Sequence, residues 1–160
     1  MYIYHVNKLK NKIKVMFKHK NLKPRYKVME ITKTKKGVIY VPPLGINHEY
    51  NIPVGIYEWE FIDPIKFGLF GEGVSSNASS RYSTYRTVGK NLWKYKGGEN
   101  GSVESMKKLD EILKVNESIN VYFYEVINPT IEIDGVRYDI NLACIEKEAK
   151  EEYKDILILK

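Results

Sequence analysis

Residues 54–126 contain three segments with the pattern of β-strands, interrupted by two helical segments, and this order constrains the fold most. Residues 54–62 alternate between side chains that suit opposite faces of a sheet. Asp63 and Pro64 then turn the chain, and residues 65–71 predict a second strand. Two strands joined by so short a turn predict an antiparallel pair at the centre of the fold.

Two helices and a third strand follow this pair. Ser75 or Ser76 is expected to cap a helix that ends near Gly89, and Ser102 to cap a second helix. Residues 119–126 have the apolar content of a core strand. The order predicts a mixed α/β (α+β) fold, in which a small three-stranded, mainly antiparallel sheet is flanked by helices. One face of the second helix is apolar: Val103, Met106, Leu109, Ile112 and Leu113.

Turn signals also predict structure before this core. A Lys35-Lys36-Gly37 turn joins residues 26–32 and 38–41 into a β-hairpin, whereas residues 8–20 fit a helix and a strand equally well. Proline and glycine residues separate this hairpin from the core. We therefore expect a basic, β-rich N-terminal extension over residues 1–52 and a main domain over residues 53–160.

After the core, Asp134-Gly135 is typical of a type I′ hairpin turn. A last helix is expected over residues 142–153, because its apolar residues recur at helical spacing. The inward-facing residues of that helix are Leu142, Ile145, Ala149 and Tyr153.

Composition excludes several classes of protein. The 160 residues are 43% hydrophobic and 29% charged, which suits one soluble domain with a short extension. No apolar run approaches the roughly 20 residues that cross a bilayer, so no membrane partner is expected. Cys144 is the single cysteine, which leaves no intramolecular disulfide or thiolate-rich zinc site and favours a reducing cytoplasm. The three histidines, His5, His19 and His48, share no metal-ligand spacing.

Basic residues are concentrated near the N-terminus. Residues 1–50 contain twelve Lys and Arg against two acidic residues, whereas residues 101–160 contain eight against thirteen. A basic third on a nearly neutral body indicates an anionic partner, because each neutralised phosphate releases condensed counterions. A solvated, lysine-rich surface explains the same distribution equally well.

Candidate chemistry rests on three side chains: Tyr57 on the first core strand, Arg81 on the next helix and Glu146 on the last. Phosphate-cradling loops and nucleophile elbows are absent from the sequence, and Gly71-Glu72-Gly73 is explained better as a turn. Each candidate also has an ordinary explanation as a packed or solvated side chain. Glu146, however, follows Ile145 at the border of the apolar stripe, where a carboxylate can coordinate Mg²⁺ in a cleft.

The candidates occur in an order that resembles a known family. Gly55-Ile56-Tyr57 resembles the first half of the GIY-YIG nuclease signature, and Leu69-Phe70-Gly71 stands one hairpin later, where the second half belongs. Ser79–Tyr85 resembles the arginine-bearing helix of the family. Residues 121–126 and 143–153 resemble its last core strand and its glutamate-bearing helix. The resemblance covers about residues 53–155.

This sequence departs from the family pattern at several points. Phe70 stands where the second signature tyrosine belongs, and Lys66 is the alternative occupant if the hairpin is registered differently. The ten residues from Gly71 to Arg81 imply a small insertion around residues 75–77, and the first fifty residues lie outside the resemblance. An inactive relative that keeps the fold is therefore an alternative.

The resemblance implies a metal-dependent endonuclease of restriction type that hydrolyses double-stranded DNA. Glu146 would anchor Mg²⁺ or Mn²⁺, and Arg81 would grip non-bridging phosphate oxygens. Tyr57 would deprotonate or orient the attacking water, and Tyr85 would support the phosphate or that water. A free phenol has a pKa of about 10, so a basic Tyr57 needs nearby cations such as the metal, Arg81 or Lys66.

The expected contacts to the DNA backbone are Lys66, Arg86, Lys90 and Lys94, while Trp93 either stacks on bases or packs in the core. Two cuts in a duplex need two active sites or two visits, so the protein is expected to be a monomer or a homodimer. Two further functions remain as alternatives: a non-catalytic nucleic-acid-binding module of the same fold, and a small nucleotide-dependent transferase.

Overall fold

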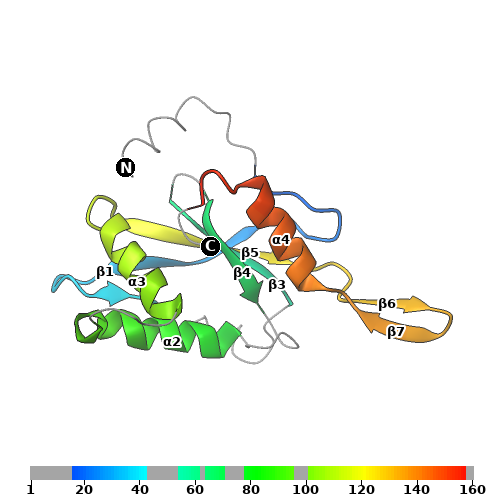
Figure 1. Ribbon diagram of the computed structural model, residues 1–160, viewed down its shortest axis with the longest axis horizontal. Coiled ribbons are helices and arrows are strands. Elements are labelled where there is room, and N and C mark those ends of the chain that lie inside the picture. The colour runs from blue at the N-terminus through cyan, green and yellow to red at the C-terminus, as the bar shows by residue number, and fades with distance from the viewer. Residues whose placement is uncertain (1–15, 43–53, 62–63, 71–77, 96–100, 158–160) are drawn as a thin grey trace.

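The computed structural model describes residues 16–42, 54–61, 64–70, 78–95 and 101–157. As predicted, the fold is mixed α/β: helices lie on both sides of a five-stranded antiparallel sheet (Figure 1). The strands of this sheet follow the order β2-β1-β5-β3-β4. They are β1 (Tyr26–Lys33), β2 (Ile39–Tyr40), β3 (Gly55–Glu60), β4 (Pro64–Phe70) and β5 (Ser118–Glu125). The helices are α2 (Ala78–Lys90), α3 (Gly101–Ile112) and α4 (Leu142–Glu152), with a 3₁₀ turn, η2 (Leu92–Lys94), after α2.

The three predicted core strands form the β4-β3-β5 part of the sheet. The predicted N-terminal hairpin adds the other two strands, because β1 pairs with β5 from Tyr26–Phe123 to Thr32–Ser118. Sequence periodicity does not identify the partner of a strand, so this long-range pairing was not foreseen. The predicted boundary after residue 52 lies outside the described residues, and the division into an extension and a main domain stays a prediction.

Two apolar clusters fill the two sides of the sheet. The first contains Tyr57 and Trp59 from β3, and α2 and α3 cover it. The second contains Ile56 from β3 and Phe67 from β4, and α4 covers it. Because successive strand residues point to opposite faces, β3 contributes to both clusters and all six of its residues are buried.

The helices follow the predicted apolar stripes. Helix α3 begins at Gly101, so Ser102 lies inside its first turn and is not the cap that the sequence predicts. The cap predicted for α2 falls on residues outside the described part of the structure. Helix α4 buries Leu142, Ile145 and Ala149 as expected. In the part of the chain that the structure describes, no helix is long and apolar enough to span a membrane.

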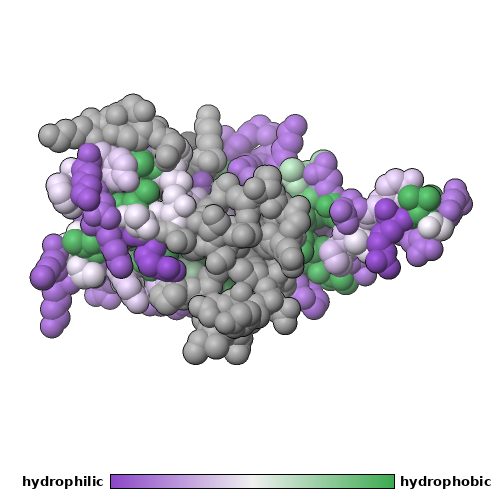
Figure 2. Space-filling model, turned by 90° about the horizontal axis from the view of Figure 1, so that it is seen from below, coloured by the Kyte–Doolittle hydropathy of each residue, from purple (hydrophilic) through white to green (hydrophobic). Residues whose placement is uncertain are grey.

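A separate two-stranded hairpin, β6 (Thr130–Ile133) and β7 (Val136–Asp139), projects from the body between β5 and α4 (Figure 1). Its turn has positive φ at Asp134 and Gly135, 51° and 78°, as the predicted type I′ turn requires. One face of the hairpin is apolar and about half exposed, and Figure 2 shows apolar side chains at this end of the molecule. That face consists of Ile131, Ile133, Val136 and Tyr138.

Candidate functional site

Two glycines allow β3 to bury Tyr57 at the centre of the sheet. A Cβ atom on Gly55 would lie 1.9 Å from the backbone oxygen of Tyr124 on the neighbouring strand. A Cβ atom on Gly68, which pairs with Tyr57, would lie 2.1 Å from the Cζ atom of that tyrosine. Both positions therefore exclude a side chain. The close approach of β5 gives a physical reason for glycine at the start of the Gly55-Ile56-Tyr57 segment.

The side chain of Tyr57 meets helix α2. Tyr57 is fully buried, and its Oη atom lies 3.4 Å from the Oη atom of Tyr85 on α2. The ring of Trp59 contacts both tyrosine rings, at centroid distances of 6.1 Å and 5.2 Å. Arg81 lies one helical turn before Tyr85, and its side chain lies outside the described part of the structure. The structure thus brings together two predicted site residues and the helix that bears a third.

Lys66 lies on the same face of the sheet as Tyr57. It pairs with Trp59 in the register between β3 and β4, and cross-strand partners point to the same face. Its Nζ atom lies 5.7 Å from the centroid of a Trp59 ring, and the residue is 8% exposed. The side chain of Phe70, the other candidate for the second signature position, lies outside the described part. The register therefore supplies a cation on the face that bears Tyr57.

Helix α4 holds Glu146 at the edge of the second cluster. Ile145 is buried, whereas the Glu146 side chain is 18% exposed, which matches the border position that the sequence predicts. Its carboxylate accepts a charge-assisted hydrogen bond from Lys150, one turn later on the helix. Tyr85 belongs to the first cluster and α4 packs against the second. The helices that bear Glu146 and Tyr85 therefore cover opposite faces of the sheet (Figure 1).

The chemistry of Glu146 fits a hard divalent cation. Among the residues that the structure describes, no three His, Cys, Asp or Glu side chains are gathered closely enough to hold a metal by themselves. Mg²⁺ does not require such a group, because waters and substrate oxygens complete its shell beside one or two carboxylates. Glu146 offers oxygen donors and partial exposure, and a bound cation would exchange with the ammonium group of Lys150.

A buried ionic cluster that was not predicted from the sequence lies on the other face of β3. Glu58 and Glu60 are 1% and 5% exposed, and both accept hydrogen bonds from Arg25, whose Nη1 atom lies 3.1 Å from Glu58 Oε2. Tyr124 donates a hydrogen bond to Glu58. Burial raises the pKa of Glu58 to about 7, helped by the hydrogen bond with Glu60 and opposed by Tyr124 and Arg25. Two acidic residues at alternate positions of a core strand were the available signal.

The residues predicted to contact DNA differ in their surroundings. The guanidinium group of Arg86 donates to the backbone oxygens of Val41, at 3.0 Å, and Pro42, at 3.3 Å, so it anchors the chain that follows β2. Lys90 and Lys94 are exposed. Trp93 is 75% exposed, so the interpretation of this residue as part of the core is wrong.

No protein-family model and no curated protein matches the chain. A solved structure of a bacteriophage T4 EndoII mutant is similar, with 19% identity and a TM-score of 0.47 over 82% of this chain and 87% of that chain. Restriction endonuclease HPY188I in complex with product DNA is similar with 14% identity and a TM-score of 0.44, over 82% of this chain and 75% of that chain. At these values neither similarity assigns a family or a function to the chain.

Proposed function

We propose that this chain is a divalent-metal-dependent endonuclease that hydrolyses phosphodiester bonds in double-stranded DNA. The observation that carries the proposal is the 3.4 Å contact between the hydroxyl groups of Tyr57 and Tyr85. This contact holds α2, with Arg81 one turn earlier, against the face of β3 that bears the tyrosine. The order of these segments is the one that the resemblance to the GIY-YIG signature implies. We further propose a restriction-type enzyme that acts in the cytoplasm as a monomer or homodimer.

Each proposed role follows from the chemistry of the side chain. Glu146 would hold Mg²⁺ or Mn²⁺, which when bound neutralises charge on the phosphate and on the departing 3′ oxygen. Because α4 and α2 cover opposite faces of the sheet, a phosphate that meets both Glu146 and Arg81 would lie at the β4 edge, where the two faces meet. Arg81 would grip non-bridging oxygens through its guanidinium fork. Tyr57 and Tyr85 are both buried, so a water oriented by their hydroxyl groups would be shielded from bulk solvent. Lys66 would favour the ionised form of such a water through its positive charge.

A second candidate function is a nucleic-acid-binding module of the same fold without catalysis. The specific observation in its favour is that Tyr57 is fully buried and Tyr85 is 2% exposed, while Glu146 already pairs with Lys150. A protein that uses these residues only for packing and helix stability would show the same contacts. The basic surface would then serve binding alone.

Incubation of supercoiled plasmid with the purified protein separates the two functions. The nuclease proposal predicts nicked and linear products that appear with Mg²⁺ and disappear with a chelator. It also predicts that Arg81→Ala abolishes cleavage and leaves plasmid binding within a few-fold of wild type. Salt-sensitive binding without any product, across a range of Mg²⁺ and Mn²⁺ concentrations, would reject the enzyme and support the binding module.

A further inference from the structure

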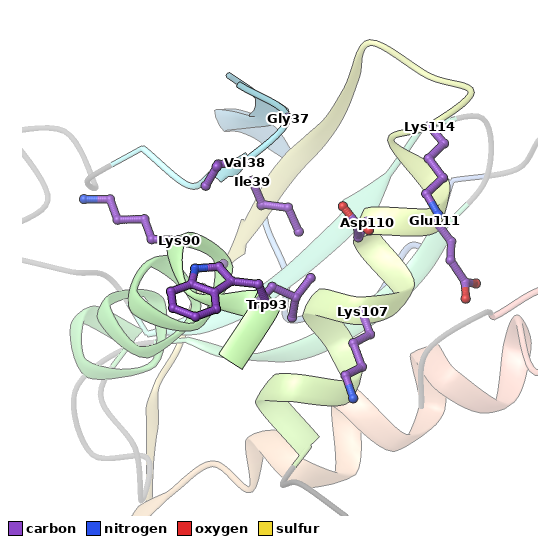
Figure 3. Close-up of a pocket in the computed structure, with 11 residues that line it drawn as sticks. Gly37, Val38, Ile39, Lys90, Trp93, Lys107, Asp110, Glu111 and Lys114 are labelled. Carbon is purple, nitrogen blue, oxygen red and sulfur yellow. The ribbon is translucent and has the colours of Figure 1, made fainter. Parts of the chain in front are cut away.

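A hollow of about 550 Å³ lies beside the C-terminal end of α2, away from the residues assigned to hydrolysis. The turn between β1 and β2 forms one wall, the end of α2 and η2 form the second, and α3 forms the third (Figure 3). Trp93 of η2 stands in this hollow opposite the side chains of α3 (Figure 3). The site is therefore built from three separate elements that the fold brings together.

The exposure of Trp93 is the first argument that the hollow binds a ligand. Its side chain is 75% exposed, whereas Trp59, the other tryptophan of the chain, is fully buried. Exposed indole surface is costly in water, and tryptophan in such positions is typical of surfaces that bind a partner. The Nζ atom of Lys94 lies 5.3 Å from the ring centroid of Trp93, so a cation already contacts this aromatic group.

The charges around Trp93 are the second argument. Lys90, Lys107 and Lys114 line the hollow together with two acidic residues of α3. The acidic residues are both paired: Asp110 lies 2.8 Å from the ammonium group of Lys33, and Glu111 lies 3.7 Å from that of Lys108. Two further exposed lysines, Lys35 and Lys36, stand in the adjoining turn. Positive charge therefore predominates, which favours an anionic ligand.

An exposed aromatic ring surrounded by lysines is suited to bind one kind of ligand, an unpaired nucleotide of a nucleic acid. Unpaired bases stack on aromatic side chains without regard to sequence, and lysines meet the phosphates on either side. In a duplex each base face is covered by its neighbours, so a duplex offers phosphates but no free face for the indole. Helix α2 also fixes where such a strand would lie: Lys90 is nine residues after Arg81, or about 13 Å along the helix axis.

We propose that the hollow around Trp93 binds an unpaired nucleotide of a single-stranded nucleic-acid segment. The base stacks on the indole of Trp93, and the flanking phosphates lie near Lys90, Lys107 and Lys114. This binding needs neither metal nor hydrolysis, so it stands independently of the proposed nuclease activity. A duplex surface and an acidic peptide are the competing occupants.

The fluorescence of the two tryptophans tests the proposal directly. In a chelating buffer, which prevents cleavage, the protein is titrated with an oligothymidylate, a blunt duplex of the same length and polyglutamate. We expect the single strand to quench the exposed Trp93 in a saturable titration, whereas the duplex and polyglutamate leave its fluorescence unchanged even where the duplex binds elsewhere on the protein. Trp93→Ala is expected to remove the quenching, leave the Trp59 signal, and weaken binding roughly 5- to 150-fold.

Matched lysine variants test the charge. The slope of log K against log salt concentration measures the salt dependence of single-strand binding. Lys90→Gln is expected to reduce this slope by about 0.7, whereas Lys154→Gln, on the exposed surface after α4, is expected to leave it unchanged. Circular dichroism verifies that each variant is folded. Equal quenching by duplex or polyglutamate, or unchanged affinity in Trp93→Ala, would overturn the proposal. Because the buffer holds no free metal, these outcomes do not depend on whether the protein cuts DNA.

Discussion

The two faces of the central sheet differ in chemistry although the same strand, β3, supplies both. On the side of α2 and α3, Tyr57 and Trp59 join Tyr85 in an aromatic group, with the ammonium group of Lys66 5.7 Å from the centroid of a Trp59 ring. On the side of α4, Glu58 and Glu60 share the positive charge of Arg25. The first face is therefore mainly aromatic, whereas the second holds two carboxylates around one guanidinium group.

The two faces differ in which carboxylates are available for chemistry. The carboxylates of Glu58 and Glu60 are occupied by Arg25 and buried, so they serve the packing of the sheet. Glu146 is more exposed and lies on a helix, where another cation can replace the ammonium group of Lys150 beside its carboxylate. The buried acids are thus committed to their contacts with Arg25, while Glu146 remains the candidate metal ligand.

Breaking the ionic face is expected to have the largest effect on stability. Arg25→Ala leaves two buried carboxylates without their cation and also removes the guanidinium group, 3.8 Å from the centroid of the Tyr122 ring. Loss of one partner from a buried ion pair costs about 3–5 kcal/mol, so the free energy of unfolding in urea should fall by that amount. Lys23→Ala, which removes a more exposed pair with Glu125, should cost less than about 1 kcal/mol. Equal losses in the two variants would contradict the account.

Crowding the aromatic face is expected to have the next largest effect. Gly68→Ala forces the new methyl group against the Tyr57 ring and should cost about 1–3 kcal/mol of unfolding free energy, because overpacking moves side chains from their preferred positions. Gly101→Ala, at a position with no neighbouring atom within 4 Å, should be close to neutral. In a Tyr57→Ala background the cost of Gly68→Ala should shrink, and an unchanged cost in that double-mutant cycle would refute the contact.

Removing one hydroxyl group from the aromatic face has a smaller effect on stability. Tyr57→Phe leaves the ring in place and removes the hydrogen bond between the Tyr57 and Tyr85 hydroxyl groups, so the free energy of unfolding should fall by about 1 kcal/mol. Under the proposed function the same variant should cut plasmid at least tenfold more slowly. Tyr138→Phe on the exposed hairpin should change neither quantity. Wild-type cleavage by a stable Tyr57→Phe protein would remove Tyr57 from the proposed site.

The ionic face should also give the free energy of unfolding a dependence on pH. The pKa of Glu58 is raised by burial to about 7 in the folded state, above the ordinary value of 4.5. A group with a raised pKa contributes stability below the unfolded value and loses it as the pH rises through the folded value. The unfolding free energy of wild type relative to Glu58→Gln should therefore decrease between about pH 4.5 and pH 7. A difference that is flat or that rises over this interval would contradict the assignment.

Local sequence signals predicted the elements of this fold well. The alternation in residues 54–62, the turn at Asp134-Gly135 and the stripe through Ile145 all correspond to elements of the structure. These signals depend on neighbours in the chain, which sequence patterns report directly.

Long-range contacts were less accessible to prediction from sequence. The pairing of β1 with β5 and the contact of Arg25 with Glu58 join residues that are distant in the chain, and no periodicity encodes them. For the candidate site, the sequence nominated Tyr57 and Tyr85, whose hydroxyl groups meet in the structure. The roles of Arg81 and Glu146 stay predictions, because each depends on a phosphate or a metal.

The most direct test of the account compares Glu146 with a neighbouring acid of the same helix. Glu148 is 61% exposed and pairs with His19, so it has the same charge without the border position. The rate of plasmid cleavage in Mg²⁺ is measured for wild type, Glu146→Ala and Glu148→Ala. Each protein is used at a concentration that binds the same fraction of the plasmid. The account predicts that Glu146→Ala loses cleavage and keeps DNA binding, while Glu148→Ala cuts at nearly the wild-type rate. Cleavage that persists in a folded Glu146→Ala protein would contradict it.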